Sequence, residues 1–301
     1  DPAIFRDDDG TLYYNWGQFA LNGAVLKDDL SGLVPGTLHT RIIDEAGHHF
    51  HEGIQLLKRK GLYYLVYTDL KTDGPRSAAR IGYSTAEKPF GPYTYRGVIV
   101  DNTGCDPKTW NDHGGLVEFG GKWYIFYHRS TNGSNTMRKA CVEPITFDEK
   151  GLIRPVEMTS QGAHINGLDA FKWISAGYAC HIYGSKVRAY VQPVYEKNDD
   201  ISSPVVNITD GTTVGFRYLN FGANTPKTVT AVLTAAAPVH VSVRLDSYDG
   251  REIASFDCPA GTQEITSDLT TGVIGKHAVY FAFASETEGP VVSFDRFTFD
   301  T

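Results

Sequence analysis

The chain has 301 residues and a formal net charge of −7, with 41% hydrophobic and 21% charged residues. This length is enough for two domains with hydrophobic cores of their own. The negative charge argues against nucleic acid as a partner, and no run of residues reaches the ~18 apolar positions that a membrane span needs. The 31 glycines, 16 phenylalanines, 17 tyrosines and 4 tryptophans are typical of short strands joined by tight turns.

Cysteine usage and the start of the chain set two further limits. Cys105, Cys141, Cys180 and Cys258 lie far apart and form no CxxC pair, so the usual zinc-site spacing is absent. A chain of this size needs no disulfide framework, and the four are expected to be free buried thiols. The sequence has no signal peptide and begins at Asp1 within a motif, which predicts that the natural protein has residues before this position.

Strand patterns dominate the first half, and no long amphipathic helix is predicted. A short apolar strand, a glycine-containing turn and an aromatic-rich alternating strand recur three times, about 50 to 60 residues apart. The apolar strands are residues 3–5, 54–57 and 116–119, and the aromatic-rich strands are residues 11–17, 61–67 and 121–127. Repeated hairpins of this kind are typical of β-propeller blades. Because a propeller needs about four to eight blades, the pattern predicts a partial ring that residues outside this sequence complete.

The second half has a different pattern, in which short strands follow one another at the spacing of a jelly-roll β-sandwich. The expected strands are residues 213–218, 228–233, 239–245, 278–283 and 292–297, with a hairpin turn at residues 249–250. The sequence therefore predicts an all-β fold in two domains. Residues 1–166 are expected to form a partial β-propeller, and residues 167–301 a β-sandwich.

Three residues with chemically useful side chains occupy equivalent places at the start of the hairpins. Asp1 precedes the first apolar strand, Glu52 the second and His113 the third. The first strand of each propeller blade lines the central axis, so these side chains are expected to converge. A pair of carboxyl groups about 6.5–9.5 Å apart cleaves glycosidic bonds with inversion. The alternative is that Asp1 and Glu52 only cap turns.

The first half has six characteristic segments, at residues 1–10 (DPAIFRDDDG), 15–17, 52–65, 81–85, 89–93 and 113–129. These segments resemble glycoside hydrolase family 43, which implies a five-bladed β-propeller. The resemblance implies that Glu52 is the general acid, which needs a raised pKa, and that Asp1 is the carboxylate that modulates the pKa of Glu52. It also implies that His113 meets the substrate or a water-coordinated calcium ion.

Further substrate contacts are implied for His51, Trp16, Arg138 and, more weakly, Arg129, although Trp16 is equally suited to the core of a blade. One departure concerns the general base, which in the family is an aspartate upstream of the motif at Asp1. No residue here matches it. The base is therefore expected from blades that this sequence lacks, and a protein beginning at Asp1 is expected to be inactive. Asp44, Asp69 and Asp101 are expected in loops or turns.

Residues 167–300 resemble a family 6 carbohydrate-binding module. The similar segments are residues 168–176, 206–214, 218–222, 243–247 and 294–297. Ser175 and Gly177 stand where such modules have two glutamates, so Asp295 alone would make a poor calcium site. Phe216 occupies an aromatic position of the sugar cleft, and Ser293 stands where asparagine is expected. The sandwich is expected either to bind glycan or only to pack on the propeller.

Together the resemblances imply a secreted or periplasmic, inverting, exo-acting glycosidase that removes α-L-arabinofuranose from plant polysaccharide such as arabinoxylan. β-Xylosidase or exo-galactanase activity of the same family is an alternative. A non-catalytic glycan-binding protein with a degenerate propeller is a hypothesis of another class, supported by the missing base. The last alternative is a propeller scaffold for protein partners. Calcium is the one cofactor considered, and no organic cofactor is expected.

Overall fold

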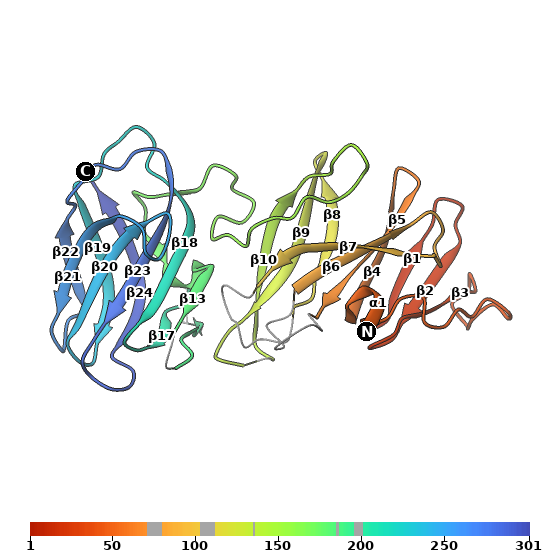
Figure 1. Ribbon diagram of the computed structural model, residues 1–301, viewed down its shortest axis with the longest axis horizontal. Coiled ribbons are helices and arrows are strands. Elements are labelled where there is room, and N and C mark those ends of the chain that lie inside the picture. Colours follow the sequence, from red (N-terminus) through yellow and green to blue (C-terminus); the bar gives the residue numbers. More distant parts are fainter. Residues whose placement is uncertain (71–79, 103–111, 135, 185–186, 196–200) are drawn as a thin grey trace. The chain divides into compact units, whose positions relative to one another are not determined.

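The computed structural model describes residues 1–70, 80–102, 112–134, 136–184, 187–195 and 201–301 (Figure 1). Cys105 lies outside the described residues. Contacts divide the chain into two compact units: the first holds the described residues of 1–102, 112–129 and 140–157, and the second those of 130–139 and 158–301. The predicted boundary at residue 166 stays a prediction. In the described part of the chain the helices are α1 (Glu45–His48) and a 3-10 turn (Ala176–Tyr178), and neither could cross a membrane.

The first half of the chain forms three sheets, which run from red to yellow-green in Figure 1. The first sheet consists of β1 (Ala3–Arg6), β2 (Leu12–Trp16) and β3 (Asn22–Leu26). The second consists of β4 (Phe50–Arg59), β5 (Leu62–Asp69), β6 (Arg80–Ala86) and β7 (Thr94–Asp101). The third consists of β8 (Gly115–Phe119), β9 (Lys122–Ser130) and β10 (Arg138–Ile145).

The three predicted hairpins are confirmed as β1–β2, β4–β5 and β8–β9, all antiparallel. Two of them turn through two residues with positive φ, Lys60-Gly61 and Gly120-Gly121, and such turns match the right-handed twist of paired strands. The first strands of successive sheets lie side by side, β1 against β4 and β4 against β8. This is the order of contacts expected of neighbouring propeller blades, whereas closure of a ring stays a prediction.

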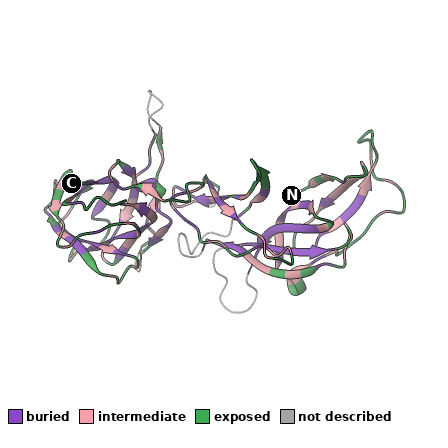
Figure 2. Cartoon of the chain, turned by 90° about the horizontal axis from the view of Figure 1, so that it is seen from above, coloured by how far each residue is buried: buried purple, intermediate pink, exposed green. Residues whose placement is uncertain are grey.

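The second sheet supplies most of the core of the first unit. Every residue of β5 after Leu62 is buried, which is typical of a strand covered on both faces of its sheet. Phe50, Leu65 and Tyr67 are at most 1% exposed and pack in one cluster with Leu21 and Ile43, which follow β2 and precede β4. The cluster therefore fixes the leading end of β4 against the segments on either side of it. Figure 2 shows the buried strands in purple and the exposed turns in green.

The second unit is a sandwich of two six-stranded sheets, as predicted. One sheet has the order β11 (Leu168–Asp169), β18 (Thr212–Asn220), β23 (Lys276–Ala284), β20 (Val239–Leu245) and β21 (Glu252–Cys258), with β13 (His181–Tyr183) also on β18. The other has the order β14 (Tyr190–Val191), β17 (Val205–Ile208), β24 (Val292–Asp300), β19 (Thr228–Ala235) and β22 (Glu264–Asp268), with β12 (Ile174–Ser175) on β24. A small hairpin joins β15 (Val194–Tyr195) to β16 (Ile201–Ser202).

The sandwich core is built mainly from phenylalanine. Phe216, Phe281, Phe294 and Phe297 have no exposed surface, and the ring of Phe216 lies 4.7 Å from that of Phe297 in an edge-to-face contact. Such pairs add about 0.5–1.5 kcal/mol to the gain from burial. Cys141, Cys180 and Cys258 are buried and form no disulfide among the described residues, as the sequence predicted.

Candidate functional site

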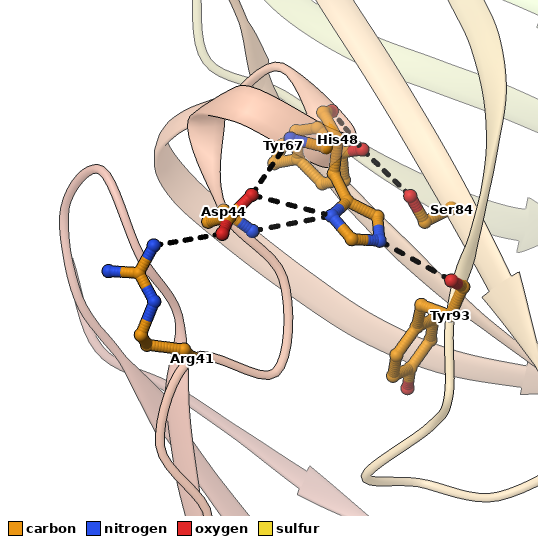
Figure 3. A network of polar contacts seen from close by, with 7 residues as sticks. Arg41, Asp44, His48, Tyr67, Ser84 and Tyr93 are labelled. Carbon is orange, nitrogen blue, oxygen red and sulfur yellow. Dashed lines mark hydrogen bonds and ion pairs between the residues drawn. The ribbon is translucent and has the colours of Figure 1, made fainter.

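The short helix α1 anchors the chain just before β4, where Glu52 lies. Asp44 caps the helix: its Oδ1 accepts a hydrogen bond from the backbone N–H of Gly47 at 2.8 Å. Figure 3 shows His48 between Asp44 and the backbone oxygen of Tyr93, which lies 3.3 Å from His48 Nε2. The hydroxyl of the buried Tyr67 donates to the backbone oxygen of His48 at 2.7 Å. These contacts hold the chain in place two residues before the strand that presents His51 and Glu52.

The leading end of β4 has an irregular backbone around Glu52. The pairing of β4 with β5 shifts register on both sides of Glu52, so the five residues from Phe50 to Ile54 face only three residues of β5. Gly53 has φ +58°, a left-handed conformation that suits glycine. A Cβ on Gly53 would lie 2.1 Å from Cδ2 of His113, because the imidazole of His113 packs directly against the Gly53 backbone. The structure therefore places His113 against the residue that follows Glu52.

A turn after β2 adds two side chains to this place. Gln18 Nε2 donates a hydrogen bond to Glu52 Oε2 at 3.0 Å. Phe19 is 51% exposed, and its ring contacts that of His51 edge-on at 5.1 Å. His51 Nδ1 lies 3.4 Å from Glu45 Oε1. We call His51, Glu52, Gly53, Gln18, Phe19 and His113 the β4 site.

Asp1 and Trp16 lie at the same end of the first sheet as the turn that contacts Glu52. Ala3 pairs with Asn15, so the residues before β1 lie opposite the end of β2. Asp1 is exposed, and Trp16 is half-buried with its ring stacked on that of Tyr14 at 5.0 Å. The approach of the Asp1 carboxylate to Glu52 and its effect on the pKa of Glu52 stay predictions.

The two arginines expected to contact substrate differ in exposure. Arg129 is buried, and its Nε donates to the thiol of Cys141 at 3.0 Å across β9 and β10. Arg138 is exposed at the first residue of β10, within the second unit. The substrate roles of both arginines stay predictions.

The sequence reasoning overlooked Asp112, which immediately precedes His113. Its side chain is 1% exposed, and its backbone oxygen accepts a hydrogen bond from the hydroxyl of Thr68, the residue opposite Glu52 on β5. Burial raises the pKa of Asp112 well above its usual range, and the nearby backbone N–H groups of His128 and His113 oppose this only in part. The sequence did contain one signal for Asp112, because it is an acidic residue directly before the predicted site residue His113.

The three aspartates expected in loops or turns have different positions. Asp44 is the helix cap described above, but Asp69 and Asp101 are the last residues of β5 and β7, so the prediction was wrong for these two. Asp69 has no exposed surface because its carboxylate is paired with Arg80, whose Nε lies 3.0 Å away, and with the hydroxyl of Tyr95 at 2.6 Å. A buried, ion-paired carboxylate is poorly placed to activate water, so Asp69 does not fit the role of the base.

In the second unit, Phe216 and Asp295 do not form the sites expected of them. Phe216 has no exposed surface, so packing in the core takes the place of the predicted substrate contact. Asp295 lies 3.8 Å from the guanidinium of its neighbour Arg296. The part of the chain that the structure describes contains no group of three or more His, Cys, Asp or Glu side chains that could hold a metal ion. A calcium ion at His113 or Asp295 stays a prediction.

The second unit also has a cavity of about 660 Å³, at the ends of β20, β21 and β23. Its lining includes Asp210, His240, Asp257 and Glu286, and none of the predicted site residues.

Comparisons with known proteins agree with this division of the chain. The model of the glycosyl hydrolases family 43 matches residues 1–153, and that of the carbohydrate binding module (family 6) matches residues 187–301. A xylosidase/arabinosidase of Thermoclostridium stercorarium is 27% identical over 98% of this chain and 69% of its own length. An arabinoxylan arabinofuranohydrolase of Bacillus subtilis is 28% identical over 99% of this chain and 63% of its own length.

A solved structure is similar over the whole chain. It is the crystal structure of a glycoside hydrolase family 43 arabinoxylan arabinofuranohydrolase from Bacillus subtilis in complex with cellotetraose, with 25% identity and a TM-score of 0.50, and the match covers 66% of that chain. This sequence thus spans about two thirds of the length of these relatives.

Proposed function

We propose, on the premise that this chain belongs to family 43 of the glycosyl hydrolases, that the intact protein is a glycosidase acting on xylan. The main support from the structure is the β4 site, where the partly exposed Glu52 directly precedes the glycine against which the imidazole of His113 packs. Curated relatives named for xylosidase, arabinosidase and arabinofuranohydrolase activity support the substrate class.

Glu52 is the general acid in this proposal. Cleavage of a glycosidic bond needs a proton on the leaving oxygen as the bond breaks, and a positioned carboxylic acid supplies it. One oxygen of Glu52 accepts the hydrogen bond from Gln18, which leaves Oε1 to present the proton. His113 lies against Gly53 and can contact the same sugar. Asp1 is the carboxylate that orients Glu52 in this proposal. A general base activates water, and we assign that role to no residue of this chain.

The sugar that we expect to be released is α-L-arabinofuranose. The relative from Bacillus subtilis is named an arabinoxylan arabinofuranohydrolase, and the relative from Thermoclostridium stercorarium is named a xylosidase/arabinosidase. β-D-Xylose is therefore the second candidate. We further propose that the sandwich binds the polysaccharide, because the carbohydrate-binding family model covers most of it. Such an enzyme would act outside the cytoplasm, where plant polysaccharide is found.

The test is hydrolysis by the full-length protein of aryl α-L-arabinofuranosides, β-D-xylosides and β-D-galactosides and of arabinoxylan itself. We expect the arabinofuranoside to be cleaved fastest. Glu52→Gln should lower kcat on arabinoxylan by about 10²–10⁴-fold, the usual contribution of a general acid. The control is Glu149→Gln, because Glu149 is exposed on the turn after β10 and far along the chain from β4.

Two outcomes would overturn the proposal. One is Glu52→Gln hydrolysing arabinoxylan at the rate of the unmodified protein, which removes Glu52 from the acid role. The other is a full-length protein that binds arabinoxylan but cleaves none of the glycosides, which would make it a glycan-binding protein.

A further inference from the structure

The turn between β2 and β3 is fixed to β4 by backbone hydrogen bonds. The backbone N–H of Phe19 donates to the oxygen of His51 at 2.8 Å, and the N–H of Glu45 donates to the oxygen of Phe19 at 3.0 Å. Glu45 is the first residue of α1, and His51 is the second residue of β4. The turn therefore moves with the strand segment that presents Glu52, although the two belong to different sheets.

The turn is also tight enough to require glycine at its first residue. Gly17 has φ +142°, and a Cβ there would lie 2.1 Å from the backbone oxygen of Ala20. Gln18 follows directly and extends its side chain to Glu52, whereas Phe19 takes a left-handed φ of +63°. This geometry fixes the Cα of Gln18 close to the β4 backbone, so its side chain has few positions to choose from.

We infer that Gln18 is a positioning residue for Glu52, which holds one carboxylate oxygen so that the other faces the leaving oxygen of the substrate. The inference rests on the proposed role of Glu52 as the general acid. Among the residues that the structure describes, Gln18 Nε2 is the only side-chain donor to this carboxylate, at 3.0 Å. An amide NH₂ donates and never accepts, so this contact selects one orientation of both side chains. A carboxylate on an exposed, bulged strand end would otherwise rotate between several rotamers.

This role differs from a merely structural one in its dependence on the leaving group. A substrate with a poor leaving group needs a well-placed proton, whereas 2,4-dinitrophenolate leaves without protonation. A variant that misplaces Glu52 should therefore lose activity on the first kind of substrate alone. A variant that disturbs the fold or substrate binding should lose activity on both.

The experiment compares phenyl and 2,4-dinitrophenyl α-L-arabinofuranosides, which share the sugar and differ only in the leaving group. Gln18→Ala removes the donor, and Gln18→Glu keeps the shape of the side chain but replaces the donor with an acceptor. We expect both variants of the full-length protein to lower kcat on the phenyl glycoside about tenfold. KM and the rate on the dinitrophenyl glycoside should change less than twofold. Gln192→Ala, which alters an exposed glutamine on the segment after β14, is the control.

Equal losses on both glycosides, a change in KM alone, or unchanged rates in both Gln18 variants would overturn the inference. Glu52→Gln separates this failure from that of the proposed function. If Glu52→Gln selectively loses the phenyl glycoside while the Gln18 variants do not, only the role of Gln18 fails. If Glu52→Gln shows no such selectivity, the general-acid assignment fails as well.

Discussion

His181 should make the sandwich less stable as the pH falls, and His181→Phe should remove this effect. His181 lies on β13, where its ring contacts that of Tyr280 edge-on at 5.7 Å. Burial, with a smaller contribution from the charge of Arg217, lowers the pKa of His181 to about 4. An unfolded chain binds a proton at this residue below pH 6.5, whereas the folded sandwich does so only near pH 4. Stability is therefore lost as the pH falls from 6.5 to about 4.

The size of the effect follows from the two pKa values. The difference between pKa values of 6.5 and about 4 corresponds to about 3 kcal/mol of unfolding free energy. This stability is fully lost only below pH 4. Phenylalanine keeps the ring contact with Tyr280 and cannot bind a proton. The free energy of unfolding of His181→Phe, relative to that of the unmodified protein, should thus rise by about 3 kcal/mol between pH 7 and pH 4.

Urea unfolding at several pH values measures this difference, with hydrogen exchange followed on peptides from β18 and β23 so that the sandwich is observed separately. His164→Phe is the matched control, because His164 is exposed. The free energy of unfolding of His164→Phe should vary with pH in the same way as that of the unmodified protein. Parallel stability curves for His181→Phe and the unmodified protein between pH 7 and pH 4 would refute the reasoning.

Gly53→Ala should lower activity about 100-fold, because the new Cβ displaces His113. Gly61→Ala is the control in the activity assays, because Gly61 also has a positive φ but a Cβ there would have no atom within 4 Å. Full activity in Gly53→Ala would show that the position of His113 is unimportant. Arg80→Met should cost about 3–5 kcal/mol of unfolding free energy, measured with urea, because it leaves Asp69 charged and buried. A loss below 1 kcal/mol in Arg80→Met would contradict the role of the ion pair.

The sequence predicted the strands well because each hairpin has its own local pattern. Alternation and glycine turns identified β1, β2, β5 and β9 and the main strands of the sandwich. The same periodicity placed Glu52 and His113 at equivalent positions, and the structure packs His113 against Gly53, the residue after Glu52. Burial was harder to predict for Asp69, because its partners Arg80 and Tyr95 come from two later strands.

Contacts between sheets were beyond the sequence pattern. Gln18 meets Glu52 from a turn 34 residues earlier in the chain, and no local spacing signals such a contact. For Phe216, in contrast, the sequence pattern already contained the information that the side chain is buried. It alternates with Val214 on β18, and both residues have no exposed surface, so the period of two already placed this ring on the inner face.

The two register shifts that flank Glu52 have a consequence for evolution and protein engineering. A single extra residue in a strand would exchange its inner and outer faces, but two extra residues restore them, so Phe50, Ile54 and Leu56 all reach the same core cluster. Deleting one residue between Phe50 and Ile54 should therefore turn the rest of β4 inside out. Deleting two would spare the core and abolish the β4 site, and exchanging residues 51 and 52 while keeping Gly53 should change the lining of the site without repacking the interior.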